Sequence, residues 1–329
     1  MSAKDFHEEA YDEGTVLKLN ILEHYLTEWL PVFLHGKTQI INIFDFHCGP
    51  GKDCSGEAGS PLRIVRVVRK YIQELNSKGV KVKGWFNDIE PGKIVSCQNC
   101  LSSESAAEVM ESHFTNNRFE EIFPKACEEM RRPGSANFVF IDPTGLVPLR
   151  EVSPRLALIP KTDVLIFAPA QHIARLARTE EFQKYLPGFP VGLGAREVPS
   201  ALCEYIKGSM PSGEQTYHHA PFAIRKGRNS NIYALIFGSG NLLGLVKFLT
   251  VTWKISPNGE ANYDLAGDLA FKDQYALEGF DTPRKIATFR KELRALVLEG
   301  VLRNNLDVSI FRCSCKNPME FTTVACYDS

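Results

Sequence analysis

The sequence predicts an α/β fold built on a doubly wound, mostly parallel sheet. Short apolar, β-branched runs recur along the chain, and such runs are typical of strands buried on both faces. Amphipathic helical segments alternate with these runs, as the crossover connections of parallel strands require. A turn containing glycines follows the first apolar run, at the place where folds of this class hold nucleotide-like ligands.

The length and composition are those of a globular protein without a membrane span. A chain of 329 residues has room for one large α/β domain and one small domain, and 44% hydrophobic content is typical of a globular protein. The formal net charge of −1 gives no global sign of nucleic-acid binding, although a local basic face stays open. We expect no membrane span and no secretory signal, because no apolar run has the required length or position.

The nine cysteines predict reduced thiols in a cytoplasmic protein, because their number is odd and their spacing irregular. Cys97 and Cys100 form a C-x-x-C, and Cys313 and Cys315 form a C-x-C, each of which could supply half of a zinc site. The remaining ligands of a familiar zinc pattern are hard to find, so we expect ordinary thiols and no metal. The adjacent His218–His219 pair is interpreted as part of a loop, since neighbouring side chains on a strand diverge.

The glycine-bearing turn is the stretch around which the rest is organised. Residues 40–45 predict a buried strand that ends in Asp45, and the next residues approximate the acid-x-Gly-x-Gly-x-Gly turn of methyltransferases. Gly49 and Gly51 match that pattern, while His47 stands in place of its first glycine. The alternative is a tight turn without a ligand. Ser60 is expected to cap the next helix, over residues 60–77, with a proline at the first helical position.

Helices flank this strand in the prediction. Apolar residues at helical spacing predict a helix over residues 15–34, lying against the edge of the sheet. The helix over residues 60–77 carries four cations that we expect on a solvated face, with a phosphate-binding track as the alternative: Arg63, Arg66, Arg69 and Lys70.

The second predicted strand, residues 80–88, also ends in an acid. Asp88 occupies the position from which a carboxylate accepts hydrogen bonds from ribose hydroxyls in nucleotide-binding folds. The alternative is an aspartate that caps the following helix, which begins at Pro91. A short strand and a helix from Phe119 come next, with a loop at residues 115–117.

Later elements continue the alternation. A strongly apolar strand at residues 136–141 ends in Asp142 and Pro143, a short helix is predicted at 154–159, and another buried strand follows at 163–169 with a helix after it. Residues 179–215 are rich in proline and glycine and predict an insertion over the carboxyl ends of the strands. Residues 220–226 and 231–238 predict an antiparallel hairpin at the sheet edge, followed by a helix from about Asn241.

The composition shifts near residue 256, so we divide the chain into a domain over residues 1–255 and a second over residues 256–329. A basic helix over residues 282–299 and a later hairpin resemble a winged helix. We interpret four cations on this helix as a nucleic-acid or partner surface, with a solvated face as the alternative: Arg284, Arg290, Lys291 and Arg294.

Three motifs taken together resemble the three-Cys-motif partner proteins. They are the Asp45–Gly51 turn, the Gly56-Glu57-Ala58-Gly59-Ser60-Pro61 stretch, and Phe140 to Gly145; the resemblance spans about residues 11–325. It implies a bacterial or archaeal protein with a Rossmann-like methyltransferase fold. It also implies a radical-SAM-like partner, encoded nearby, which carries the three cysteines that name the family; the cysteines of this chain are therefore not that motif.

The turn and the resemblance predict S-adenosylmethionine as the cofactor. Seven residues are candidates to bind it: Asp45, His47, Gly49, Gly51, Ser60, Asp88 and Asn117. Asp142 and Pro143 are the catalytic candidates, because in methyltransferases that act on exocyclic amines such a pair accepts the amine hydrogens. The family usually has phenylalanine where this chain has Thr144, so Phe167 or Tyr185 would have to supply a stacking ring.

These observations lead to three hypotheses of function. The first is an S-adenosylmethionine-dependent methyltransferase that acts on nucleic acid. The second is a non-catalytic partner or regulator of the radical-SAM-like protein. The third is a phosphodiesterase acting through Asp45, Asp88 and Asp142, which lack the His and Asp clustering of a two-metal site.

Overall fold

The structure is a computed structural model that describes residues 10–143, 145, 147–210, 217–225 and 232–255, together with 294, 295 and 298. Its centre is a seven-stranded sheet with the order β3-β2-β1-β4-β5-β7-β6. The strands are β1 (Ile40–Asp45), β2 (Lys81–Asn87), β3 (Glu111–Thr115), β4 (Ser135–Ile141), β5 (Thr162–Ala168), β6 (His218–Arg225) and β7 (Ile232–Ser239).

The sheet confirms the predicted fold class. Strands β3, β2, β1, β4 and β5 pair in parallel, and β7 runs antiparallel to both β5 and β6. The predicted hairpin is therefore present, with β7 inserted beside β5 and β6 at the edge. Asp45 lies opposite Phe86 of β2 and Phe140 of β4, so the carboxyl ends of three strands meet at one edge of the sheet. Chain order reverses between β1 and β4, and ligands bind at such a switch point in open α/β sheets.

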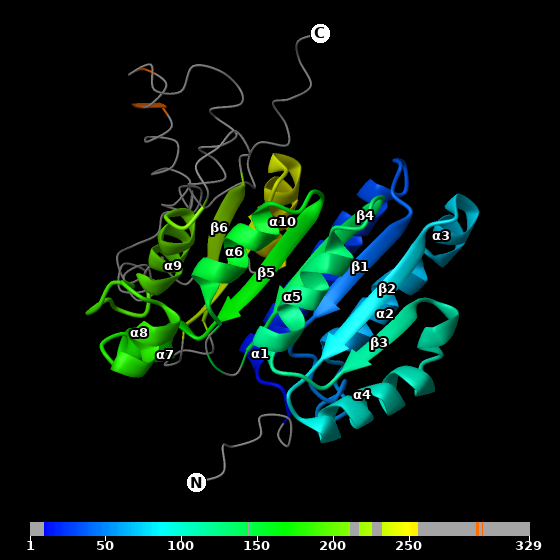
Figure 1. Cartoon of the computed structure of the whole chain (residues 1–329), viewed down its shortest axis with the longest axis horizontal. Helices are drawn as coiled ribbons and strands as arrows, with labels where there is room; N and C mark the ends of the chain where they lie inside the picture. The colour runs from blue at the N-terminus through cyan, green and yellow to red at the C-terminus, as the bar shows by residue number, and fades with distance from the viewer. Residues whose placement is uncertain are drawn as a thin grey trace, which may run out of the picture.

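Helices cover both faces of the sheet (Figure 1). One face carries α1 (Glu13–Trp29), η1 (Leu30–Phe33), α2 (Ser60–Lys70), α3 (Ile72–Lys78), α4 (Pro91–Ser103), η2 (Ala106–Glu108) and α10 (Leu242–Ile255). The other face carries α5 (Phe119–Met130), α6 (Leu149–Ala157), α7 (Ala170–Leu176), α8 (Glu180–Tyr185) and α9 (Val198–Lys207). Each face buries its own apolar cluster, which explains why the central strands β1, β4 and β5 are buried along almost their whole length.

The first helix lies on a face of the sheet, which corrects the predicted place at its edge. Tyr25 is fully buried and its ring contacts Phe138 of β4, Phe237 of β7 and Phe248 of α10 at centroid distances of 5.7, 4.9 and 6.1 Å. Its hydroxyl donates a 2.6 Å hydrogen bond to Asp163 of β5. This aromatic contact anchors α1 across the middle of the sheet and leaves its first turns at the carboxyl ends of the strands.

Several predicted boundaries are wrong in instructive ways. The helix expected over residues 60–77 is two helices, because Tyr71 adopts φ −111° and ends α2. Its N-cap is Gly59, so Ser60 is the first helical residue and not the cap. His218 and His219 are the first residues of β6, paired with Ser239 and Gly238, and not part of a loop.

The segment predicted as an insertion over the active face divides into two parts. Its beginning, Thr179 to Tyr185, lies beside the cavity described below, whereas α9 packs on the sheet face with Leu202 and Ile206 in the core. The proposed winged-helix domain and its basic residues Arg284, Arg290 and Lys291 lie outside the described residues, and Arg294 is described only as exposed. No helix in the described ranges has the length and apolar character to cross a membrane.

Candidate functional site

The glycine turn predicted after β1 is present, and its glycines adopt an unusual backbone conformation. Gly49 and Gly51 adopt φ of 63° and 90°, the left-handed region that side chains disfavour. A Cβ atom on Gly51 would lie 3.0 Å from Cβ of Cys100, because α4 packs directly on the turn. Cys97 and Cys100, the C-x-x-C pair for which we expected ordinary thiols, are free thiols on this helix. Among the described residues, no three His, Cys, Asp or Glu side chains group as metal ligands.

Asp88 links the second strand to this turn. One of its carboxylate oxygens accepts a hydrogen bond from the backbone N–H of Gly49 at 3.1 Å, and the other accepts from Glu90 N–H at 2.9 Å. The alternative of an aspartate that caps α4 is not what the structure shows, because the N-cap is Glu90 and, at this end of the helix, Asp88 bonds only the N–H of that residue. Each Asp88 carboxylate oxygen also has a second lone pair for another donor.

Asn87 organises the ends of three strands, and sequence analysis missed it. Its amide nitrogen donates to the carbonyls of Phe46 and Asn117, at 3.2 and 3.0 Å, and its amide oxygen accepts from Asn117 N–H at 3.1 Å. Thr115 donates to the same oxygen at 2.9 Å. These bonds hold the predicted loop residue Asn117 beside the β1 turn. An asparagine directly before the strand-ending acid was the available signal.

Arg63 corrects the prediction of a solvated cationic face. It is 5% exposed, and its guanidinium donates to Ala58 O at 2.9 Å, Asn20 Oδ1 at 2.7 Å, Glu23 Oε2 at 3.1 Å and Glu57 Oε1 at 2.7 Å. The loop that precedes α2 is therefore clamped to α1 by one buried side chain. Arg66 and Arg69, on the same helix, are exposed as predicted.

Asp53 holds the other end of this loop. Its carboxylate accepts hydrogen bonds from the N–H groups of Tyr11, Ser55 and Glu57, at 2.6, 2.9 and 2.8 Å. The bond to Tyr11 attaches the start of the described chain to the glycine loop. The Tyr11 hydroxyl lies 3.1 Å from where a Cβ of Gly59 would stand, so this ring lies against the loop.

Asp45 is fully buried at the end of β1. Burial raises the pKa of its carboxyl to about 7, with Asp142 and Asp88 adding to the rise, while the Ser60 hydroxyl and the His47 N–H oppose it. The predicted residues Asp45, Ser60, Asp88 and Asp142 are therefore brought together at one edge of the sheet. A carboxyl with a pKa near 7 changes charge in the neutral range.

His47, in the position of the missing glycine, contributes a neutral imidazole. Burial lowers its pKa to about 4, against the effect of the nearby carboxylates of Asp142 and Asp88. The ring stacks on Phe119 with centroids 5.7 Å apart. Its Nδ1 is buried without a hydrogen-bond partner among the described side chains and backbone groups. A buried polar atom of this kind is expected to meet a ligand or water.

Asp142 follows β4 and is paired with a lysine that sequence analysis did not identify. Lys18 of α1, 6% exposed, forms an ion pair with Asp142 Oδ2. The lysine Nζ also lies 4.3 Å from the centroid of the Phe167 ring, which stacks on Tyr233 at 4.9 Å. Phe167 is engaged by these two contacts, so of the two rings predicted to replace the missing aromatic, Tyr185 is the more available.

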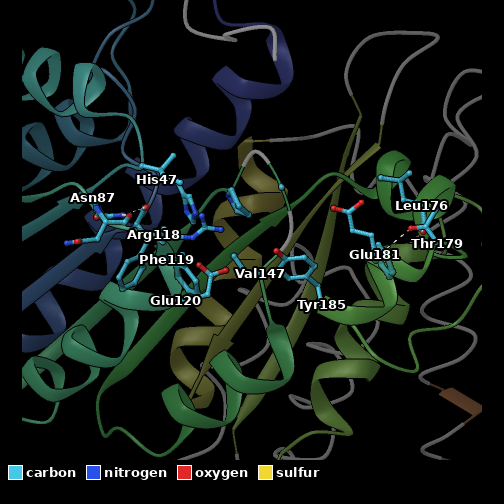
Figure 2. Close-up of a pocket in the computed structure, with 16 residues that line it drawn as sticks. His47, Asn87, Arg118, Phe119, Glu120, Val147, Leu176, Thr179, Glu181 and Tyr185 are labelled. Carbon is cyan, nitrogen blue, oxygen red and sulfur yellow. Dashed lines mark hydrogen bonds between the residues drawn. The ribbon is translucent and has the colours of Figure 1, made fainter. Parts of the chain in front are cut away.

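A cavity of about 550 Å³ opens beside these groups (Figure 2). One wall comes from the ends of β1, β2 and β3 and the start of α5, through His47, Asn87, Asn117 and Phe119. The opposite wall comes from α7 and α8, through Leu176, Glu181 and Tyr185, and Figure 2 shows Glu181 and Tyr185 pointing toward the first group. Pro143, Gly145 and Val147 also line the cavity, and Figure 2 shows Val147 between the two groups. Ile89, Leu176 and Tyr185 on its rim are large apolar side chains at least 38% exposed.

The predicted site residues divide into two groups around this cavity. His47, Asn117 and Pro143 line it directly. Asp45, Gly49, Gly51, Ser60, Asp88 and Asp142 are not part of its wall; most of them shape or charge the turn beside it. The cavity residues that sequence analysis missed are mainly apolar, such as Ile89 and Phe119, and resemble ordinary core residues in sequence.

No protein-family model matches the chain, and no curated protein matches it. Solved structures to which it is similar include Trm1 from Pyrococcus horikoshii in complex with S-adenosyl-L-methionine, with 14% identity and a TM-score of 0.43 over 73% of this chain and 58% of that one. A SAM-dependent methyltransferase from Agrobacterium tumefaciens gives 8% identity and a TM-score of 0.39 over 69% and 62%. A methyltransferase from Geobacter sulfurreducens has 12% sequence identity and a TM-score of 0.32, over 69% of this chain and 79% of that one.

The chain thus spans less than two thirds of the first two structures. At these identities and TM-scores, the likeness concerns the fold and not the reaction. The conclusion that the chain has a Rossmann-like fold with an antiparallel β7 rests on its own strand order.

Proposed function

We propose that this protein binds S-adenosylmethionine at the carboxyl ends of β1, β2 and β4 and transfers its methyl group to an acceptor in the adjacent cavity. The observation that carries the proposal is the convergence at one sheet edge of a left-handed glycine turn, the Asp88 carboxylate and the Asp142 carboxylate, beside a cavity of about 550 Å³. A methyltransferase needs these three elements together: a close backbone approach, an acceptor for ribose hydroxyls, and a group that orients the nucleophile.

The residues present fit the cofactor. Gly49 and Gly51 leave the backbone of the turn beside Asp88 without side chains, and both adopt the left-handed φ that glycine favours. His47 lines the cavity, and its buried Nδ1, which has no hydrogen-bond partner among the described residues, is an atom that a bound ligand or a water would satisfy. The carboxylates of Asp45, Asp88 and Asp142 suit a ligand that carries hydroxyl, ammonium and sulfonium groups. In this arrangement Asp88 would hold the ribose, Gly49 and Gly51 would lie along the amino-acid part, and Asn117 would border the adenine.

Asp142 and Pro143 are the proposed catalytic pair. The bound cofactor supplies an electrophilic methyl group on a sulfonium. The protein's task is to position an amine or hydroxyl and to accept hydrogen from it. Asp142 Oδ2 is occupied by Lys18, which leaves Oδ1 to accept from the nucleophile. The Pro143 carbonyl is a second acceptor, and the proline ring limits movement of the turn.

A nucleobase is the acceptor that the cavity favours. Tyr185 presents an exposed ring to it, and Phe119 and Phe182 add apolar surface, which suits a flat heterocycle. Arg118 lines the same cavity and offers a cation for a phosphate. The basic helix predicted over residues 282–299 would extend that surface.

A second candidate is a binding protein that does not transfer the methyl group, acting as a partner of a radical-SAM-like enzyme. The ion pair on Asp142 favours it, because Lys18 occupies Oδ2, one of the two carboxylate oxygens that could orient an acceptor. The two candidates share the cofactor and differ in turnover.

Calorimetry with S-adenosylmethionine and S-adenosylhomocysteine tests the shared part. The wild type should bind both, and Asp88→Asn should weaken both by about 1.5–3 kcal/mol, the usual worth of a hydrogen bond to a charged group. Glu90→Gln removes the same charge two residues away, where the side chain is exposed, and should change affinity little. Binding of neither ligand would refute the proposal. Methyl transfer to RNA or DNA from labelled cofactor then separates the enzyme from the binding protein.

A further inference from the structure

The buried lysine beside Asp142 is not among the site residues predicted from the sequence. Lys18 lies on α1, 6% exposed, in an ion pair with Asp142 and 4.3 Å from the Phe167 ring centroid. Burying an ammonium is costly unless it is paired, and removing one member of a buried pair leaves an uncompensated charge. Lys18 and Asp142 therefore form a neutral unit at the sheet edge.

The position of this pair gives it an electrostatic role. Asp142 lies close enough to Asp45 to raise the pKa of the Asp45 carboxyl, so both aspartates act on the same small region at the ends of β1 and β4. Three carboxylates, those of Asp45, Asp88 and Asp142, converge there. Lys18 supplies a positive charge in direct contact with this group.

We infer that Lys18 is the specificity-determining counter-ion of the site: by neutralising Asp142 it sets the preference between the sulfonium cofactor and its neutral thioether product. This inference rests on the proposed function. S-adenosylmethionine and S-adenosylhomocysteine differ by one methyl group and one positive charge, so the ratio of their affinities reports the electrostatic potential at the sulfur.

The net charge of the Lys18–Asp142 pair affects methyl transfer. The sulfonium charge disappears as the methyl group leaves, so an unpaired carboxylate beside it would stabilise the bound cofactor more than the transition state. A carboxylate whose charge is balanced by Lys18 keeps its hydrogen-bonding ability without that penalty. A purely structural pair, which only fastens α1 to β4, would instead affect both ligands equally.

The experiment is a charge cycle on the two side chains, read by calorimetry with the two ligands at pH 8. Lys18→Met leaves the Asp142 carboxylate unpaired and should raise the preference for S-adenosylmethionine about tenfold, as expected for one unit charge acting over roughly 10 Å at an effective dielectric constant near 20. Asp142→Asn leaves the ammonium unpaired and should lower that preference about tenfold. The double variant, neutral at both positions, should return within about threefold of the wild-type ratio.

Two controls separate charge from folding. Lys83, on β2, is a half-buried lysine that forms an ion pair with Glu129 of α5 at 3.7 Å. Lys83→Met should leave the ratio of the two ligand affinities unchanged. Lys18→Arg keeps the charge and should keep the ratio even if both affinities fall. If Lys18→Met does not fold, Asp142→Asn decides alone, because it preserves the side-chain shape.

The outcomes are distinguishable. A wild type that binds both ligands, with the same ratio in Asp142→Asn and Lys18→Met, overturns the counter-ion role and leaves the proposed function standing. A ratio that moves in the same direction in both single variants also overturns it. A wild type that binds neither ligand removes the proposed function and the inference with it.

Discussion

Replacing Arg63 with methionine should destabilise the fold by about 3 kcal/mol, toward the low end of the range for breaking a buried ion pair. The guanidinium connects α1, about 40 residues earlier in the chain, with the loop that directly precedes α2. Its nitrogens donate to Asn20 and Glu23 on α1 and to Ala58 and Glu57 in the loop before α2. Methionine keeps most of the aliphatic stem, so the substitution removes the hydrogen bonds and the charge with little loss of packing.

The acceptors do not contribute equally. Glu57 is 44% exposed and becomes solvated by water when Arg63 is removed, so its bond contributes little. Glu23, 19% exposed, keeps a second partner in Lys70 at 3.5 Å, which reduces its cost. The Ala58 carbonyl and the Asn20 amide lose their guanidinium donor, and hydrogen bonds to a charged group contribute about 1.5–3 kcal/mol each. Two such losses, with partial compensation by water, give the expected value.

Urea unfolding followed by circular dichroism measures the effect, with Arg66→Met as the matched control. Arg66 is exposed on the same helix, so its replacement should change the free energy of unfolding by less than about 0.5 kcal/mol. A loss for Arg63→Met no greater than that of the control would refute the assignment of Arg63 as a buried clamp. The unfolding slope should match the wild type, since a change in slope would indicate an altered denatured state.

Two further predictions concern the glycine turn and the core. Gly51→Ala should destabilise more than Gly56→Ala, because both glycines have φ near 90° but only the Cβ of Gly51 would meet another residue, Cys100 at 3.0 Å; thermal unfolding of the pair separates contact from backbone strain, and equal losses would contradict the packing. Burial raises the pKa of Asp163 from 3.8 to about 6, against hydrogen bonds from Ser239 and Tyr25. The pKa of Asp163 is higher in the folded state than in the unfolded state. The stability that the protonated carboxyl contributes is therefore fully present below about pH 4 and is lost as the pH rises through about 6. The stability of Asp163→Asn relative to the wild type should therefore rise on the order of 2 kcal/mol between pH 4 and pH 7 in urea titrations, and a constant difference would show that Asp163 keeps an ordinary pKa.

The order of elements and the glycine turn were predictable from sequence for local reasons. A run such as residues 138–141 is apolar at every position, which is typical of a strand buried on both faces, and β4 is buried throughout. The acid at a strand end followed by Gly49 and Gly51 predicts a left-handed turn, because glycine adopts that backbone without strain. Pro91 likewise indicated the start of α4.

Contacts between distant segments decided the rest. Periodicity shows that α1 is amphipathic, but its place on the sheet face depends on Tyr25 meeting rings from β4, β7 and α10. Arg63 resembles its exposed neighbours in sequence, and its burial depends on acceptors five to 43 residues away. Lys18 and Asp142 are separated by 124 residues, and neither predicts the other. Sequence pattern reports the preference of a residue for apolar or polar surroundings, whereas the partner that satisfies a buried charge is chosen only when the chain has folded around it.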